Sequence, residues 1–179
     1  MYNFFKKWTK KEDGSTAIEF ALIAIPFVFM LIGIIELSLY FATTSLIHGA
    51  AETAARLIRT GQVQQSLGDP QQMFEDALCE HAATFVNCND IQYEVITLAN
   101  FGDFENYPPQ YDDDGNLITS GFSAGGVNDV VLIRAVHRYN FATPLLAPVL
   151  GENGGNSRLI LSTIILQTEP YDFDEDEGA

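Results

Sequence analysis

Basic residues, histidine and cysteine are scarce in this 179-residue sequence, and each scarcity argues against a class of function. Nine lysines and arginines stand against 24 aspartates and glutamates, and the net charge of −15 leaves no basic surface for the phosphates of a nucleic acid. The three histidines are scattered along the chain, and the sequence has no glycine-rich phosphate loop. We therefore expect neither nucleic-acid binding nor enzymatic activity, and no cofactor.

The two cysteines, Cys79 and Cys88, are expected to form a disulfide in an oxidising compartment. Closing a loop of about ten residues would stabilise the fold by roughly 2–3 kcal/mol. Two free, buried thiols are the alternative, because sequence alone does not give the distance between them. Together with His81 they offer only three zinc ligands at an unfamiliar spacing, so we expect no metal site here.

A long apolar run is the strongest feature that the sequence does contain. Residues 20–35 read FALIAIPFVFMLIGII without a charge, and the apolar character continues past Glu36. As a helix, residues 15–42 would be about 42 Å long, which is enough to cross the hydrocarbon core of a membrane. A cleaved secretory signal has a shorter apolar core, and a helix of a soluble protein is seldom apolar on all sides. The run therefore predicts a single membrane-spanning helix.

The distribution of basic residues predicts the orientation of this helix. Only arginines follow the run, whereas every lysine precedes it: Lys6, Lys7, Lys10 and Lys11. By the positive-inside rule, the N-terminal segment stays in the cytoplasm and the rest of the chain is exported.

Glu19 lies at the start of the apolar run, where a carboxylate in lipid is costly unless it has a partner. One interpretation is an ordinary helix start, with Ser15 or Thr16 as N-cap and an acidic residue in the first turns. The other is that Glu19 pairs with a positive charge from outside this chain.

The segment GSTAIEFALIAIPFVFMLIGIIELSLY, followed by AAETAARLIRTGQ, resembles the TadE/TadF-type minor pseudopilins of the tight-adherence (Flp) pilus system. The resemblance covers residues 14–60 and rests on two glycines, two acidic residues, a proline and an Ala-rich stretch that ends in arginine: Gly14, Glu19, Pro26, Gly33, Glu36, Ala54, Ala55 and Arg56. It implies that a prepilin peptidase cuts between Gly14 and Ser15, and that Glu19 pairs with the free amine of a neighbouring subunit. It does not separate TadE-like from TadF-like members.

The resemblance also implies a location and partners. The protein would be a single-pass protein of the bacterial inner membrane with a periplasmic C-terminal domain, and it would take part in pilus assembly and enter an extracellular pilus. Its partners would be the prepilin peptidase, other pilin and pseudopilin subunits, and the inner-membrane assembly platform. The alternative is an uncleaved single-pass membrane protein whose exported domain binds a ligand or an envelope partner.

The remaining patterns predict an α+β fold. We expect a long helix over residues 16–60, a second helix from Asp69 to about Phe85, and an antiparallel sheet with one better-buried face, its strands at 91–99, 129–141 and 158–168. The chain then divides into a leader (1–14), the membrane and extended helix (15–61), an exported α+β domain (62–168) and an acidic tail (169–179).

Two connections in the exported domain have unusual compositions. The acidic turn Asp112–Asn116 lacks the bidentate glutamate of an EF-hand, so we expect a solvated turn, with a calcium site as the alternative. The segment between the last two strands is too apolar for an ordinary loop. Its leucines and Val149 are expected to fill the core, and the alternative is that they face a partner or the membrane surface.

Overall fold

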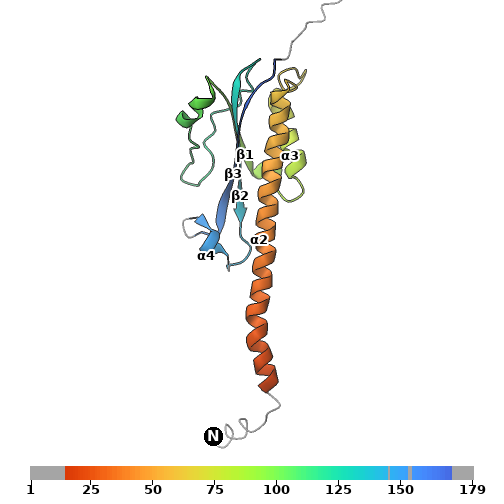
Figure 1. The fold of residues 1–179 in the computed structure, drawn as a ribbon, viewed down its shortest axis with the longest axis vertical. Coiled ribbons are helices and arrows are strands. Elements are labelled where there is room, and N and C mark those ends of the chain that lie inside the picture. The colour runs from red at the N-terminus through yellow and green to blue at the C-terminus, as the bar shows by residue number, and fades with distance from the viewer. Residues whose placement is uncertain (1–14, 145, 153–154, 171–179) are drawn as a thin grey trace, which may run out of the picture.

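The computed structural model describes residues 15–144, 146–152 and 155–170. These residues form an α+β fold, as the sequence predicts (Figure 1). In chain order the elements are α2 (Ser15–Arg59), α3 (Pro70–Ala82), the 3-10 turn η2 (Cys88–Asp90), β1 (Ile91–Leu98), the 3-10 turn η3 (Phe101–Asn106), β2 (Val130–Asn140), α4 (Ala147–Leu150) and β3 (Ser157–Gln167).

Helix α2 is the longest element, with 45 residues, and at 1.5 Å per residue it measures about 68 Å. It runs through Pro26 without a break, so the predicted long helix is confirmed. Its N-terminal half projects away from the rest of the protein, and its C-terminal half packs on the sheet (Figure 1). The packed half buries Ile47 and Ile58 together with four alanines, Ala50, Ala51, Ala54 and Ala55. These small side chains let the helix lie close to its neighbours.

The three strands form an antiparallel sheet in the order β1-β2-β3. Alternate residues of β2, including Val131, Ile133 and Ala135, point toward α2 and α3 and join the main hydrophobic core. In this register Val95 of β1 and Ile164 of β3 both lie opposite Ile133. The helix-covered face of β2 is therefore apolar at every second residue from Val131 to Ala135.

The second face of β2 is also buried, under a smaller apolar cluster, so the expected better-buried face of the sheet is the one that the helices cover. Leu132 and Arg134 on this face are almost completely inaccessible. The reason is the long connection between β1 and β2, which includes η3 and folds back over the sheet on the side away from α2 (Figure 1). Within it, Gly121 and Ser123 bond to the backbone of Val95 at 3.1 and 2.7 Å, so the connection also covers the outer edge of β1.

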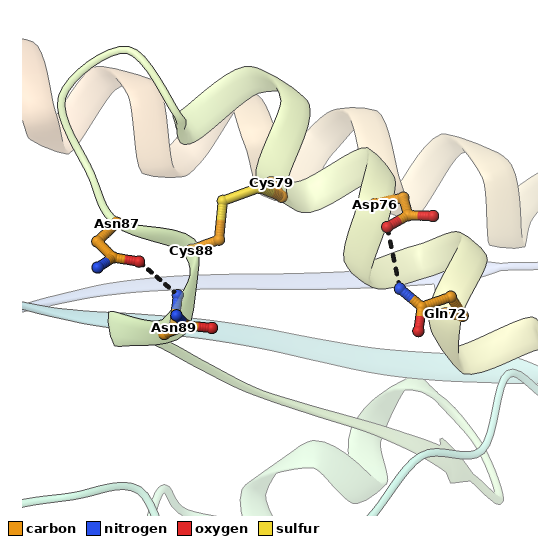
Figure 2. The surroundings of a disulfide bond; sticks show 6 residues. All are labelled: Gln72, Asp76, Cys79, Asn87, Cys88 and Asn89. Atoms are coloured by element: carbon orange, nitrogen blue, oxygen red, sulfur yellow. Dashed lines mark hydrogen bonds between the residues drawn. A yellow bond between two sulfur atoms is a disulfide. The ribbon is translucent and has the colours of Figure 1, made fainter.

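A disulfide between Cys79 and Cys88 joins the last turns of α3 to the segment that leads into β1 (Figure 2). The two Cα atoms are 5.3 Å apart, and the predicted pairing is confirmed. Next to Cys88, the side chain of Asn87 accepts a hydrogen bond from the backbone of Asn89 at 3.1 Å and starts η2. Helix α3 ends at Ala82, shortly before the expected end, because the chain turns back here toward the sheet.

Candidate functional site

The N-terminal half of α2 presents an apolar surface that the rest of the described chain does not cover. Its large side chains are exposed on every side of the helix, among them Ile18, Phe20, Leu22, Ile25, Phe29 and Met30. Among the described residues, α2 is the one helix that is long and apolar enough to cross a membrane. The exposed side chains belong to the same run that the sequence predicts to be a membrane span.

The predicted assembly residues lie at the start of this apolar surface. Ser15 is the first residue of α2, and Glu19 is exposed in its second turn. Gly14 lies outside the described residues, as do the rest of the leader and residues 171–179 of the acidic tail. Cleavage between Gly14 and Ser15 and an assembly role for Glu19 therefore stay predictions.

Glu36 marks the point where α2 meets the rest of the domain. Its side chain is only 4% exposed, and a buried carboxylate is costly unless its oxygens are hydrogen-bonded. Thr143 supplies both bonds: its backbone N–H donates to Oε1 at 2.9 Å, and its hydroxyl donates to Oε2. The second acidic residue of the motif is therefore a joint between α2 and the connection that follows β2.

An aromatic cluster surrounds this joint. Tyr40 of α2 packs against Tyr139 and Phe141, with ring centroids 5.4 and 5.9 Å away. Burial, with a smaller contribution from the charge of Glu36, raises the pKa of Tyr139. The joint thus combines two hydrogen bonds with apolar packing that excludes water.

Two further polar contacts hold α2 against the sheet. His48 Nδ1 lies 2.8 Å from the hydroxyl of the buried Ser162 on β3. At the end of the helix, Arg59 forms an ion pair with Glu169 at 3.3 Å, and the backbone N–H of Glu169 donates to the carbonyl of Arg59 at 2.9 Å. With Glu36 and Thr143, these contacts attach α2 to the domain at three levels along the helix.

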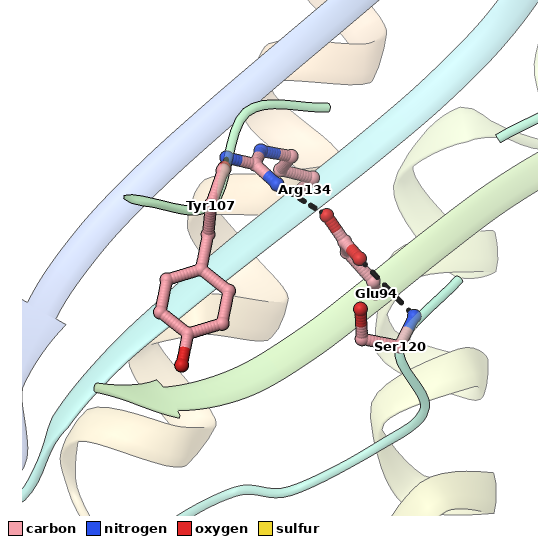
Figure 3. A network of polar contacts seen from close by, with 4 residues as sticks. All are labelled: Glu94, Tyr107, Ser120 and Arg134. Carbon is pink, nitrogen blue, oxygen red and sulfur yellow. Dashed lines mark hydrogen bonds and ion pairs between the residues drawn. The ribbon is translucent and has the colours of Figure 1, made fainter. Parts of the chain in front are cut away.

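A buried ion pair lies on the opposite face of the sheet (Figure 3). Arg134 Nη1 of β2 is 2.5 Å from Glu94 Oε1 of β1, and both side chains are 4% exposed. Glu94 also accepts a hydrogen bond from the backbone N–H of Ser120 at 3.2 Å, and Arg134 donates to the carbonyl of Tyr107. The pair therefore attaches the β1–β2 connection to the sheet at two points, Tyr107 and Ser120.

The acidic turn is closed by its own hydrogen bonds. Asp112 accepts bonds from the backbone N–H and the side-chain amide of Asn116, at 2.7 and 3.0 Å, and these bonds lower the pKa of Asp112. Gly115 adopts φ +75° to complete the turn. Across the described parts of the chain, no three His, Cys, Asp or Glu side chains gather as a metal site would require.

Sequence reasoning found the apolar surface and the disulfide, but it missed the two buried carboxylates as structural joints. A signal was present for each. Glu36 interrupts an apolar segment, and Glu94 and Arg134 stand in otherwise apolar strands, where a charge must find a partner. The sequence pattern does not tell which residue each of these charged side chains will contact.

Comparison with known proteins bears on the N-terminal segment. Residues 14–56 match the model of a family described as TadE-like protein. The match begins at Gly14, ends at Arg56 and leaves α3 and the three strands outside it. No curated protein and no solved structure matches the chain. The resemblance is confirmed for this segment, and the match is consistent with a TadE-like protein of the tight-adherence pilus system.

Proposed function

We propose that this protein is a minor pseudopilin that takes part in the assembly of a tight-adherence (Flp) pilus. It is inserted in the bacterial inner membrane with its basic leader in the cytoplasm, and a prepilin peptidase cuts it between Gly14 and Ser15. The observation that carries the proposal is that α2 leaves the domain with its apolar half uncovered, within the segment that matches the TadE-like family.

The exposed apolar half supports a role in which the surroundings of the helix change. In the membrane these side chains contact lipid, and burial of apolar surface favours that location. In a pilus the same side chains would contact the helices of neighbouring subunits. A structural subunit of a pilus needs a surface that can contact either lipid or the helices of other subunits, whereas an enzyme needs a set of convergent titratable groups.

Cleavage would give Glu19 a role when α2 leaves the lipid and packs against neighbouring subunits. Cutting after Gly14 creates a free amine on Ser15, and the same reaction on a neighbouring subunit creates the amine that Glu19 would meet. A carboxylate in an apolar environment is costly by itself, and an ion pair offsets that cost only when the two groups come together. Glu19 would therefore select the stagger at which subunits pack.

The three joints between α2 and the sheet support a mechanical role for the exported domain. Because Glu36, His48 and Arg59 all bond to the rest of the domain, a displacement of the helix moves the domain with it. The domain would then present its surface to other pilus components in a set orientation. The prepilin peptidase, other pilins and pseudopilins, and the membrane assembly platform are the partners that this role requires.

The intact mass of the protein purified from membranes of its own host tests the proposal. A chain that begins at Ser15 is the expected result, and reduction should add the mass of two hydrogen atoms because the Cys79–Cys88 bond opens. A matched variant with a bulky residue in place of Gly14 should retain the leader, because the peptidase needs close approach at that position. A wild-type chain that still carries Met1, in cells with an active prepilin peptidase, would favour the uncleaved membrane protein with an exported binding domain.

A further inference from the structure

The connection between β2 and β3 lies close to the level at which α2 leaves the membrane. We infer that residues 142–144 and 146–151 of this connection, which include α4, rest on the outer surface of the lipid bilayer and bury Val149 at the boundary between headgroups and hydrocarbon. The inference depends on the membrane span of the proposed function, and it adds a second membrane contact, made by the exported domain.

The joint at Glu36 places the connection along the membrane normal. A hydrocarbon core of about 30 Å takes about 20 helical residues, so a span that begins at Phe20 ends near Leu39. Glu36 lies one turn before that end, and Thr143 is hydrogen-bonded to it. Figure 1 shows α4 at the end of the domain nearest to the projecting half of α2. Residue 143 and its neighbours therefore lie at the membrane boundary whenever α2 is inserted.

The side chains of this connection suit an apolar boundary. Val149 of α4 is 78% exposed, and Pro144 and Pro148 are exposed as well. Ala147, on the same short helix, is buried, so α4 has an inner side and an outer side. Transfer of an exposed aliphatic side chain and its neighbouring prolines from water to the bilayer surface removes apolar area from water, which lowers the free energy.

The backbone of α4 also satisfies a requirement of that environment. Groups that leave water must have hydrogen-bond partners, and three consecutive N–H groups here have them. Val149 and Leu150 donate to the carbonyl of Leu146 at 3.0 and 2.9 Å, and Gly151 donates to the carbonyl of Ala147 at 2.8 Å. The turn can therefore approach hydrocarbon without exposing unpaired donors at these positions.

The exposed apolar surface of α2 extends to the depth of the Glu36–Thr143 contact. This continuity favours lipid over a protein partner as the occupant of the surface. Ile34, Ile35, Leu39 and Phe41 are exposed on the turns around the joint. The same bilayer that surrounds Ile34 and Ile35 reaches the connection without any further component. Glu36, the carboxylate at this depth, is shielded from lipid by its bonds to Thr143. The connection and α2 together would set how deeply the helix sits before it is transferred to a pilus.

Spin labels on the full-length protein in phospholipid nanodiscs test the inference. A nitroxide is attached at Val149→Cys under non-reducing conditions, which preserve the native disulfide, and its collision rates with oxygen and with a water-soluble nickel chelate are compared. Leu67→Cys is the matched control, because Leu67 is also a strongly exposed aliphatic side chain and lies beyond the other end of α2. Phe29→Cys reports the membrane span itself. We expect the oxygen-to-nickel ratio at residue 149 to exceed the ratio at residue 67 several-fold.

Each other outcome would overturn the inference in a different way. A lipid-like ratio at residue 29 with a water-like ratio at residue 149 would leave the span intact and refute the surface contact. Water-like ratios at both positions would refute the span, and with it the proposed membrane subunit. A label at residue 149 that neither reagent reaches would show burial by protein instead of lipid.

Discussion

The buried pair of Glu94 and Arg134 gives the sharpest prediction on stability, because the chain offers a matched control. In Glu94→Gln the side chain keeps its shape but loses its charge, which leaves the guanidinium of Arg134 buried without a counter-charge. One of the two bonds that Glu94 accepts, from Arg134 Nη1 or from the N–H of Ser120, also loses its acceptor. Breaking a buried pair in this way costs about 3–5 kcal/mol.

The control is the Arg–Glu pair at the end of α2. The side chains of Arg59 and Glu169 are 59% and 52% exposed, so water screens their attraction. Glu169→Gln should therefore change the free energy of unfolding by less than about 1 kcal/mol. The same chemical change is thus expected to differ several-fold in cost between the two pairs, and burial is the reason.

Urea unfolding of the full-length protein in a non-ionic detergent, followed by near-ultraviolet circular dichroism, measures both changes. A third variant, Glu94→Leu with Arg134→Met, removes both charges and should be more stable than Glu94→Gln, because no unpaired charge is left in the core. The reasoning would be refuted if Glu94→Gln and Glu169→Gln had similar costs, or if the double variant were the least stable of the three.

Three more predictions concern the disulfide, the half-buried Tyr93 and the carboxylate of Glu19. Replacing Cys79 and Cys88 by serine should lower the free energy of unfolding by roughly 2–3 kcal/mol, measured in the same urea assay, and an unchanged midpoint would contradict the expected constraint on the unfolded chain. Burial, and then the hydrogen bond to Glu75, raises the pKa of Tyr93 to about 12. Because the folded-state pKa lies above the ordinary phenol value of about 10, the contribution of Tyr93 to stability is complete below that value and is lost as the pH rises through its raised pKa. The ultraviolet difference titration of wild type against Tyr93→Phe should show this late ionisation, and a difference at the ordinary phenol pKa would argue against it. Glu19→Ala should leave leader cleavage intact on immunoblots while reducing the number of pili seen by electron microscopy, and normal piliation would rule out charge pairing in assembly.

Local patterns in the sequence were sufficient for several features of this protein. The uncharged run at residues 20–35 predicts a membrane span because composition alone decides whether a helix is apolar on all sides. Asp69 and Pro70 predict the start of α3 because capping depends on neighbouring residues, and Asp69 does accept the N–H of Gln71 at 3.0 Å. With only two cysteines, one intramolecular pairing was available.

The tertiary structure decided which distant groups meet. Glu36 finds Thr143 across 107 residues, and His48 finds Ser162 across 114 residues. These partners depend on the register of the sheet and on where α2 crosses it, and neither quantity is encoded in the periodicity of one segment. The burial of both faces of β2 was missed for the same reason, since it depends on how the connection before it folds back. The sequence by itself therefore determined the long apolar helix and the strands, because these follow from composition and near neighbours, and it left a single pairing for the two cysteines. The joints that attach the helix to its domain, and the place of α4 beside it, required the packed fold, because only packing brings together groups that are distant in the chain.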